Sequence, residues 1–170
     1  MVSTLNHEDL NGAEQVSFGD KKAFVISGPG EYEVKGVFIK GLASESSYDG
    51  EKRINTIYTV SLEGMNICFL GAVGNPELPA ETDEAIDEVD ILFVPIGGDG
   101  VLDPVAAYKL AVAMNPKIII PIHYGDMGKD GSLKTFLKEA GESPTPIAKL
   151  TLKKKDLEGK DAEVIVLERE

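Results

Sequence analysis

The stretch VDILFVPIGGDGVLDPVAAYKLAVAMNPKIIIPIHYGD, residues 89–126, decides the fold of this chain. Residues 90–95 form a continuous apolar run, which is typical of a strand covered on both faces. Asp103-Pro104 predicts a helix N-cap followed by proline at the first helical position, and Asn115-Pro116 ends that helix. Residues 118–122 form a second apolar run. Strand, helix and strand with short connections predict a right-handed parallel crossover.

The residues before this unit predict an antiparallel meander, in which Glu63-Gly64 is a hairpin signal. The residues after it predict a helix over 133–140, closed by Gly141, and a terminal strand over 161–167. We therefore expect a layered α/β or α+β sandwich that forms a single domain over residues 1–170. Upstream strands are expected at 23–27, 32–40, 56–62 and 66–70, with a loop at 41–53.

Composition narrows the classes of function. The chain has 170 residues and a net charge of −12, and such a surface repels phosphate backbones, so nucleic-acid binding is disfavoured. No apolar run reaches the ~18 residues that span a bilayer, and the first ten residues, MVSTLNHEDL, lack a signal-peptide pattern. We expect a cytoplasmic protein with no membrane partner. The single cysteine, Cys68, lies in an apolar strand and is interpreted as a buried hydrophobe.

The chain holds only two histidines, His7 and His123. His123 follows the 118–122 strand, and loops at the carboxyl ends of parallel strands are where open α/β sheets build their sites. It is therefore a candidate metal ligand or proton shuttle, or else a histidine that only caps a backbone carbonyl. His7 and Asp9 are two residues apart in the sequence and can converge on one metal ion together with His123. Further loop carboxylates, each with solvation as the simpler interpretation, are Asp49, Asp99 and Asp126.

Four segments in order resemble the metallo-β-lactamase superfamily, and most closely its bacterial branch of zinc-dependent hydrolases of β-lactamase fold. The segments are GPGEYEVKGV at 28–37, FLGAVG at 69–74, VDILFVPIGG at 89–98 and IIPIHYG at 119–125. The resemblance runs from about residue 3 to the C-terminus. It implies an αββα sandwich, in agreement with the sandwich expected above.

The resemblance also implies where metal ligands should stand. The family carries a His-x-His-x-Asp-His loop, which falls on residues 5–10, and His7 and Asp9 match its second histidine and its aspartate. The closing histidine of the family matches His123. We therefore predict His7, Asp9 and His123 as the remaining metal-ligand positions. The other family ligands fall on Leu5, Leu10, Ala72 and the histidine-free loop 44–49.

Three hypotheses follow. The first is a non-catalytic domain of this fold, kept as a binding or structural module, with no tightly bound cofactor expected. The second is a hydrolase of ester, phosphodiester or amide bonds that uses zinc, iron or manganese, with a site completed by carboxylates such as Asp99 or Asp126. The third is a subunit whose site is completed by another polypeptide.

The family normally places several strands before its metal loop, and this chain starts almost at that loop. We therefore expect the sandwich to lack its first strands and to expose a sheet edge. An unpaired edge invites pairing. We expect a second copy of the chain, as a homo-oligomer, or another partner chain to pair with that edge.

Overall fold

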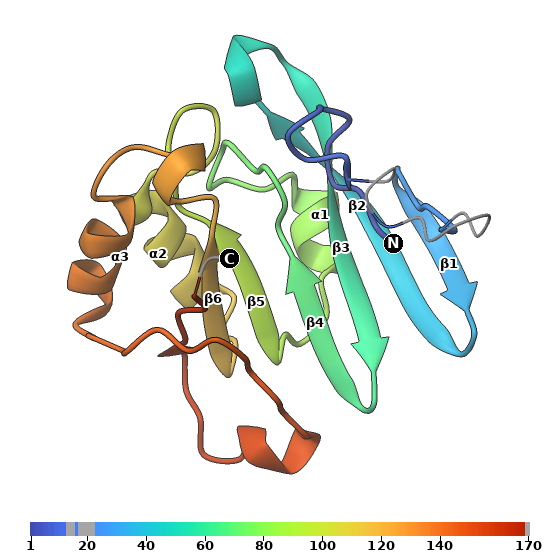
Figure 1. Ribbon diagram of the computed structural model, residues 1–170. Helices are drawn as coiled ribbons and strands as arrows, with labels where there is room; N and C mark the ends of the chain where they lie inside the picture. The colour runs from blue at the N-terminus through green and yellow to red at the C-terminus, as the bar shows by residue number, and fades with distance from the viewer. Residues whose placement is uncertain (13–15, 17–22, 169–170) are drawn as a thin grey trace.

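The computed structural model describes residues 1–12, 16 and 23–168, which form one seven-stranded mixed sheet with strands in chain order (Figure 1). The α-helices are α1 (Ala80–Ala85), α2 (Pro104–Ala113) and α3 (Ser132–Ala140). The strands are β1 (Gly30–Val34), β2 (Val37–Ser46), β3 (Arg53–Leu62), β4 (Met65–Phe69), β5 (Ile91–Pro95), β6 (Ile118–Ile122) and β7 (Glu163–Val164). The expected mixed α/β class is confirmed.

The first four strands form the expected antiparallel meander, but its first hairpin was missed. The single strand expected over 32–40 is two strands, because Lys35 and Gly36 both take positive φ, 53° and 79°, and reverse the chain. Two such residues make the tight turn that joins hairpin strands. β2 continues to Ser46, into the loop expected from residue 41. The turn at Glu63-Gly64 joins β3 to β4 as predicted.

The crossover unit is confirmed. β5 and β6 are parallel neighbours, with Ile91 opposite Ile118, and α2 connects them. Asp103 caps α2 as predicted, since its carboxylate accepts hydrogen bonds from the backbone N–H groups of Val105 and Ala106 at 3.0 and 3.1 Å.

Two strands expected at the ends are much shorter than predicted. In the stretch 23–27 only Ile26 forms a bridge, to Val2. The terminal strand is limited to β7. Beyond it the Ile165 N–H still donates to Ile119 O at 2.9 Å, and Leu167 then bridges to Ile147.

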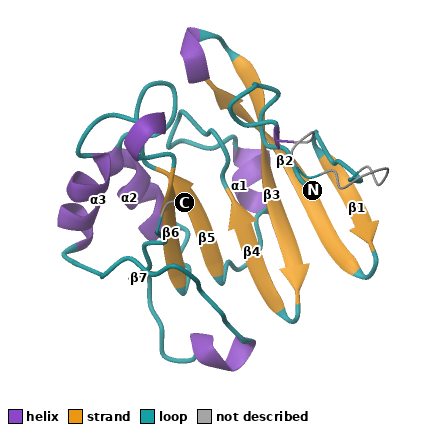
Figure 2. Cartoon of the chain, viewed as in Figure 1, coloured by secondary structure: helices purple, strands orange, loops and turns teal. Residues whose placement is uncertain are grey.

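The sheet has two different faces. α1, α2 and α3 cover one face, and the main core lies between them and β3–β6 (Figure 2). The C-terminal segment, residues 147–168, contributes to both faces: Val164 and Val166 join the main core, and Leu157 packs on the other face against Met65, Ile91 and Ile118. Lys154 ties this segment down, since its Nζ lies 2.8 and 2.7 Å from the two oxygens of the buried Asp90 carboxylate. The central strands are thus covered from both sides.

No described helix has the length and apolar character needed to cross a membrane. The sequence-based expectation of one domain over residues 1–170 stays a prediction.

Cys68 is 1% exposed in the main core, and its burial makes its contribution to the free energy of unfolding depend on pH. Burial raises the pKa of its thiol from 9.0 to about 12, so the unfolded chain loses this proton at lower pH than the folded chain. Its contribution to stability is therefore full below pH 9 and is lost as the pH rises toward 12. At pH 10 the free energy of unfolding should be lower than at pH 8 by about 1 kcal/mol from this group alone.

We predict that Cys68→Ala removes this part of the alkaline loss, measured by urea unfolding of both proteins at pH 8 and 10. A thiol reagent should label native wild-type protein only as fast as the chain unfolds. Fast labelling of the folded protein at pH 8, or an equal alkaline loss in both proteins, would contradict a buried and protonated thiol.

Candidate functional site

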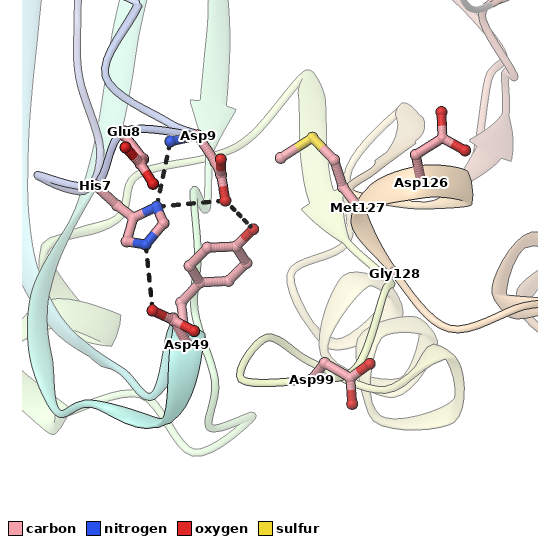
Figure 3. A pocket seen from close by; sticks show the side chains of 9 residues that line it. His7, Glu8, Asp9, Asp49, Asp99, Asp126, Met127 and Gly128 are labelled. Atoms are coloured by element: carbon pink, nitrogen blue, oxygen red, sulfur yellow. Dashed lines mark hydrogen bonds and ion pairs between the residues drawn. The ribbon is translucent and has the colours of Figure 1, made fainter.

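A cavity of about 400 Å³ lies at the carboxyl ends of β5 and β6, between the N-terminal loop and the loops that follow these strands. Its position agrees with the rule that α/β sheets build their sites at this end. Figure 3 shows the side chains that line it. They are His7, Glu8, Asp9, Tyr48, Asp49, Asp99, Asp126 and Met127, with the backbone of Gly128.

Two of the three predicted metal-ligand residues meet in this cavity. The His7 ring lies between two carboxylates, with Nδ1 3.5 Å from Asp9 Oδ2 and Nε2 3.6 Å from Asp49 Oδ2 (Figure 3). The backbone N–H of Asp9 donates to His7 Nδ1 at 3.2 Å. Nδ1 therefore accepts a hydrogen bond within the protein, and Nε2 faces Asp49 at more than hydrogen-bond distance.

Tyr48 is a cavity residue that the sequence reasoning did not select. Its hydroxyl donates to Asp9 Oδ2 at 3.1 Å, and its ring packs edge-on against His7 with centroids 5.0 Å apart. Burial raises the pKa of the Tyr48 hydroxyl above its ordinary value, and the hydrogen bond to Asp9 and the negative charge of that residue add to the effect. The hydroxyl therefore stays protonated and holds Asp9 in place. The one sequence signal for this role was the presence of an aromatic residue in the otherwise polar loop 44–49.

His123, the third predicted ligand, lines a different hollow. That hollow has a volume of about 250 Å³ and a largely apolar lining that includes Phe93, Ile122 and Leu167. Met127 lines both cavities and so lies between them. His123 Nδ1 is buried without a hydrogen-bond partner among the described residues, and burial lowers the pKa of the imidazole to about 4. The ring is neutral at pH 7.

Leu5, Leu10 and Ala72, for which the resemblance implies ligand positions, come together in space as apolar side chains. Leu5 and Ala72, 1% and 0% exposed, pack with Val101, and Leu10 and Tyr48 lie against them. We call these five residues the Leu5 cluster. It adjoins the cavity, because Tyr48 belongs to both. The positions at which the resemblance implies further ligands thus hold packed apolar side chains.

Buried Asn55 on β3 fixes the loop that carries Ala72. Its Oδ1 accepts the backbone N–H of Ala72 at 2.8 Å, and its Nδ2 donates to Leu70 O and Ser44 Oγ, both at 2.8 Å. Gly71 turns between them with φ 67°, and a Cβ there would lie 2.6 Å from Asn55 Oδ1. This network was not visible in the sequence, because an isolated asparagine in a strand pattern gives no signal.

The described residues contain no group of three histidine, cysteine, aspartate or glutamate side chains placed to hold a metal ion. Within the cavity, His7 has only two carboxylates near it, and its acceptor nitrogen already takes a backbone N–H. Structural and catalytic zinc sites need three or four donor atoms with unused lone pairs. This donor set does not fit the metal that the resemblance implies.

Comparisons with known proteins place the chain in a family. The model of the Beta-lactamase superfamily domain matches residues 2–123. A UPF0173 metal-dependent hydrolase of Thermoplasma acidophilum is 33% identical over 101 residues, 58% of this chain and 45% of that protein. Another from Thermococcus kodakarensis is 29% identical over 142 residues, 82% of this chain and 56% of that protein. The chain thus spans about half the length of these relatives.

Solved structures support the same family assignment. A Thermotoga maritima protein described as a Zn-dependent hydrolase of the metallo-beta-lactamase superfamily has a TM-score of 0.72 and 31% identity, covering 98% of this chain and 79% of that one. A protein from Parabacteroides distasonis described as a metal-dependent hydrolase has a TM-score of 0.63 and 20% identity, covering 99% and 76%, and supports the fold alone. The resemblance noted from the sequence is confirmed: the chain belongs to the metallo-β-lactamase superfamily.

Proposed function

We propose that this chain is a non-catalytic member of its superfamily, kept as a binding or structural module and not as a hydrolase. The observation that carries the proposal is the Leu5 cluster. Leu5, Leu10 and Ala72, which the sequence resemblance aligns with three family ligands, pack into one apolar group. A histidine placed among them would bury a polar ring without partners, which costs free energy. The cluster therefore stabilises a state without metal.

The hydrogen bonds of His7 support the same proposal. A metal bound to Nδ1 would have to displace the backbone N–H of Asp9. Hydrolysis in this family class depends on a firmly held metal that lowers the pKa of bound water. With Nδ1 already used and no group of three donors among the described side chains, this requirement is not met.

A metal-dependent hydrolase with a rearranged or partner-completed site is the second candidate. The relatives named as metal-dependent hydrolases favour it, and so does the buried Nδ1 of His123, which lacks a partner in the described structure. Such a site would have to draw on carboxylates like Asp99 or Asp126 together with His123. His123 and those carboxylates line two different cavities that share Met127, so the second candidate requires the two cavities to join.

The metal content of the protein decides between the two. We predict well under one zinc, iron or manganese ion per chain after purification without chelators, measured by elemental analysis, because three donors are not assembled. Added zinc should also leave the melting temperature unchanged, since a ligand stabilises only a state that it binds. One or two ions per chain, lost in His7→Gln or His123→Asn, would overturn the proposal.

Activity gives an independent prediction. Hydrolysis of a generic phosphodiester or thioester by the purified protein with added zinc or manganese should not exceed the rate in buffer with the same metal, because no firmly held metal activates water. His123→Asn is the informative variant, since asparagine tolerates the positive φ of 55° at this position. Lys134→Glu, on the exposed side of α3, is the control. Activity that His123→Asn abolishes and Lys134→Glu preserves would establish the hydrolase instead.

A further inference from the structure

The hollow of about 250 Å³ beside His123 is a gap at one end of the smaller core. Phe93 of β5, Ile120 of β6 and Leu167 of the C-terminal segment line it, and all three also pack in that core. Met127 closes it from the loop after β6. The C-terminal end of the chain lies in front of β5 and β6 here (Figure 1). The hollow is therefore walled mostly by hydrocarbon.

The polar side chains of this lining differ in what they bind. The Tyr124 hydroxyl donates to Leu167 O at 3.0 Å and so joins the loop after β6 to the C-terminal segment. Glu168 is exposed, so water hydrates its carboxylate. The His123 ring, in contrast, receives no hydrogen bond from the described residues, and its Nδ1 is shut off from water. His123 is thus the polar group of the lining whose hydrogen-bonding capacity the described residues leave unused.

The backbone, and not a hydrogen bond to the ring, holds His123 at the hollow. Its φ is 55°, a region that residues other than glycine seldom adopt. Two glycines pack against its carbonyl oxygen, since a Cβ at Gly97 would lie 2.2 Å from His123 O and one at Gly128 would lie 2.7 Å from it. Such uncommon backbone conformations persist only where the surroundings enforce them, and they gather at ligand sites.

The state of the ring indicates what it can bind. Burial lowers the pKa of the His123 imidazole to about 4, so at pH 7 the ring is neutral and has one acceptor nitrogen. A buried polar atom without a partner costs free energy, and a ligand that donates a hydrogen bond removes that cost. Because no hydrogen bond from the described residues fixes the ring, a donor in the hollow can orient its acceptor nitrogen. Apolar walls disfavour a charged ligand.

The size and the lining of the hollow limit the ligand further. An apolar cavity of roughly 150 Å³ already admits benzene, so about 250 Å³ admits a single or a fused pair of rings. Phe93 in the lining favours an aromatic ligand, because aromatic pairs gain free energy beyond their buried area.

We propose that this hollow binds a small uncharged aromatic molecule with one N–H or O–H donor. The donor bonds to the His123 ring, and the aromatic rings pack against Phe93, Ile122 and Leu167. This inference rests on the proposed function in one respect, because a metal ion on His123 would occupy the acceptor nitrogen. The experiment must therefore separate the two.

Nuclear magnetic resonance of the full chain with ¹⁵N-labelled histidine tests the proposal, with indole as the probe. The chain has two histidines, so His7 serves as an internal reference. Indole should shift the ring nitrogen signals of His123 and leave those of His7 unchanged. Its dissociation constant should be below about 1 mM, as a ligand of this size can reach. The analogue 1-methylindole lacks the N–H and should bind about fivefold more weakly, the effect of one neutral hydrogen bond.

Variants locate the site, with binding followed through the signals of indole itself. Leu167→Trp fills the hollow, and His123→Asn removes the ring while asparagine tolerates the positive φ. Each should raise the dissociation constant at least about fivefold. Val112→Trp is the matched control, since it changes a residue of α2 that is 44% exposed on the helix side of the sheet. It should leave binding within about twofold. Circular dichroism checks that each variant folds.

The titration is run on the protein with and without prior EDTA treatment. Equal binding in both forms supports this inference and the proposed function together. Binding that appears only after EDTA overturns the proposed function and keeps this inference. The absence of any His123 shift at about 5 mM indole in both forms overturns this inference alone. Binding that Leu167→Trp leaves unchanged, or 1-methylindole that binds as tightly as indole, also overturns it.

Discussion

The structure depends on one constraint: the central strands β4–β6 must be covered on both faces. Their side chains supply the main core on one side, with α2 and α3, and a smaller core on the other, with the 147–168 segment. Parallel strands with nearly continuous apolar sequences cannot leave one face in water without a large loss of buried area. The helix crossover and the returning C-terminal segment both follow from this need. The position of the cavity follows from the same need, because both faces of the central strands are covered and only the loops at the strand ends can form a site.

The sequence predicted the elements that this constraint governs and missed those set by local backbone geometry. Asp103-Pro104 and Asn115-Pro116 mark the ends of α2 chemically, so the crossover could be predicted. The turn at Lys35-Gly36 could not be found from lysine, which has no turn preference. A signal did exist in Gly36, because glycine adopts at no cost the positive φ that this turn requires.

The candidate site was only partly predictable for a different reason. His7 and Asp9 are neighbours in sequence, and their proximity in the cavity was foreseeable. Contacts between distant segments were not. Tyr48 reaches Asp9 across 39 positions of sequence, and Asn55 holds Ala72 across 17. The family resemblance identified Leu5, Leu10 and Ala72 one at a time. Only the fold shows that they pack together as one cluster.

The Leu5 cluster also has a structural role, because it holds together loops from distant parts of the chain. In a metal centre, coordination holds loops from distant parts of a chain together, and an apo site loses that support. Here the same loops are joined without coordination, by apolar packing of Leu5, Ala72 and Val101 and by the hydrogen bonds of Asn55. Burying one leucine contributes about 1.5 to 3 kcal/mol, comparable with several hydrogen bonds. Under the proposed function, leucine at these positions removes metal affinity and supplies by packing the rigidity that a metal would give. Reversing one such position alone would then cost stability before any metal could bind.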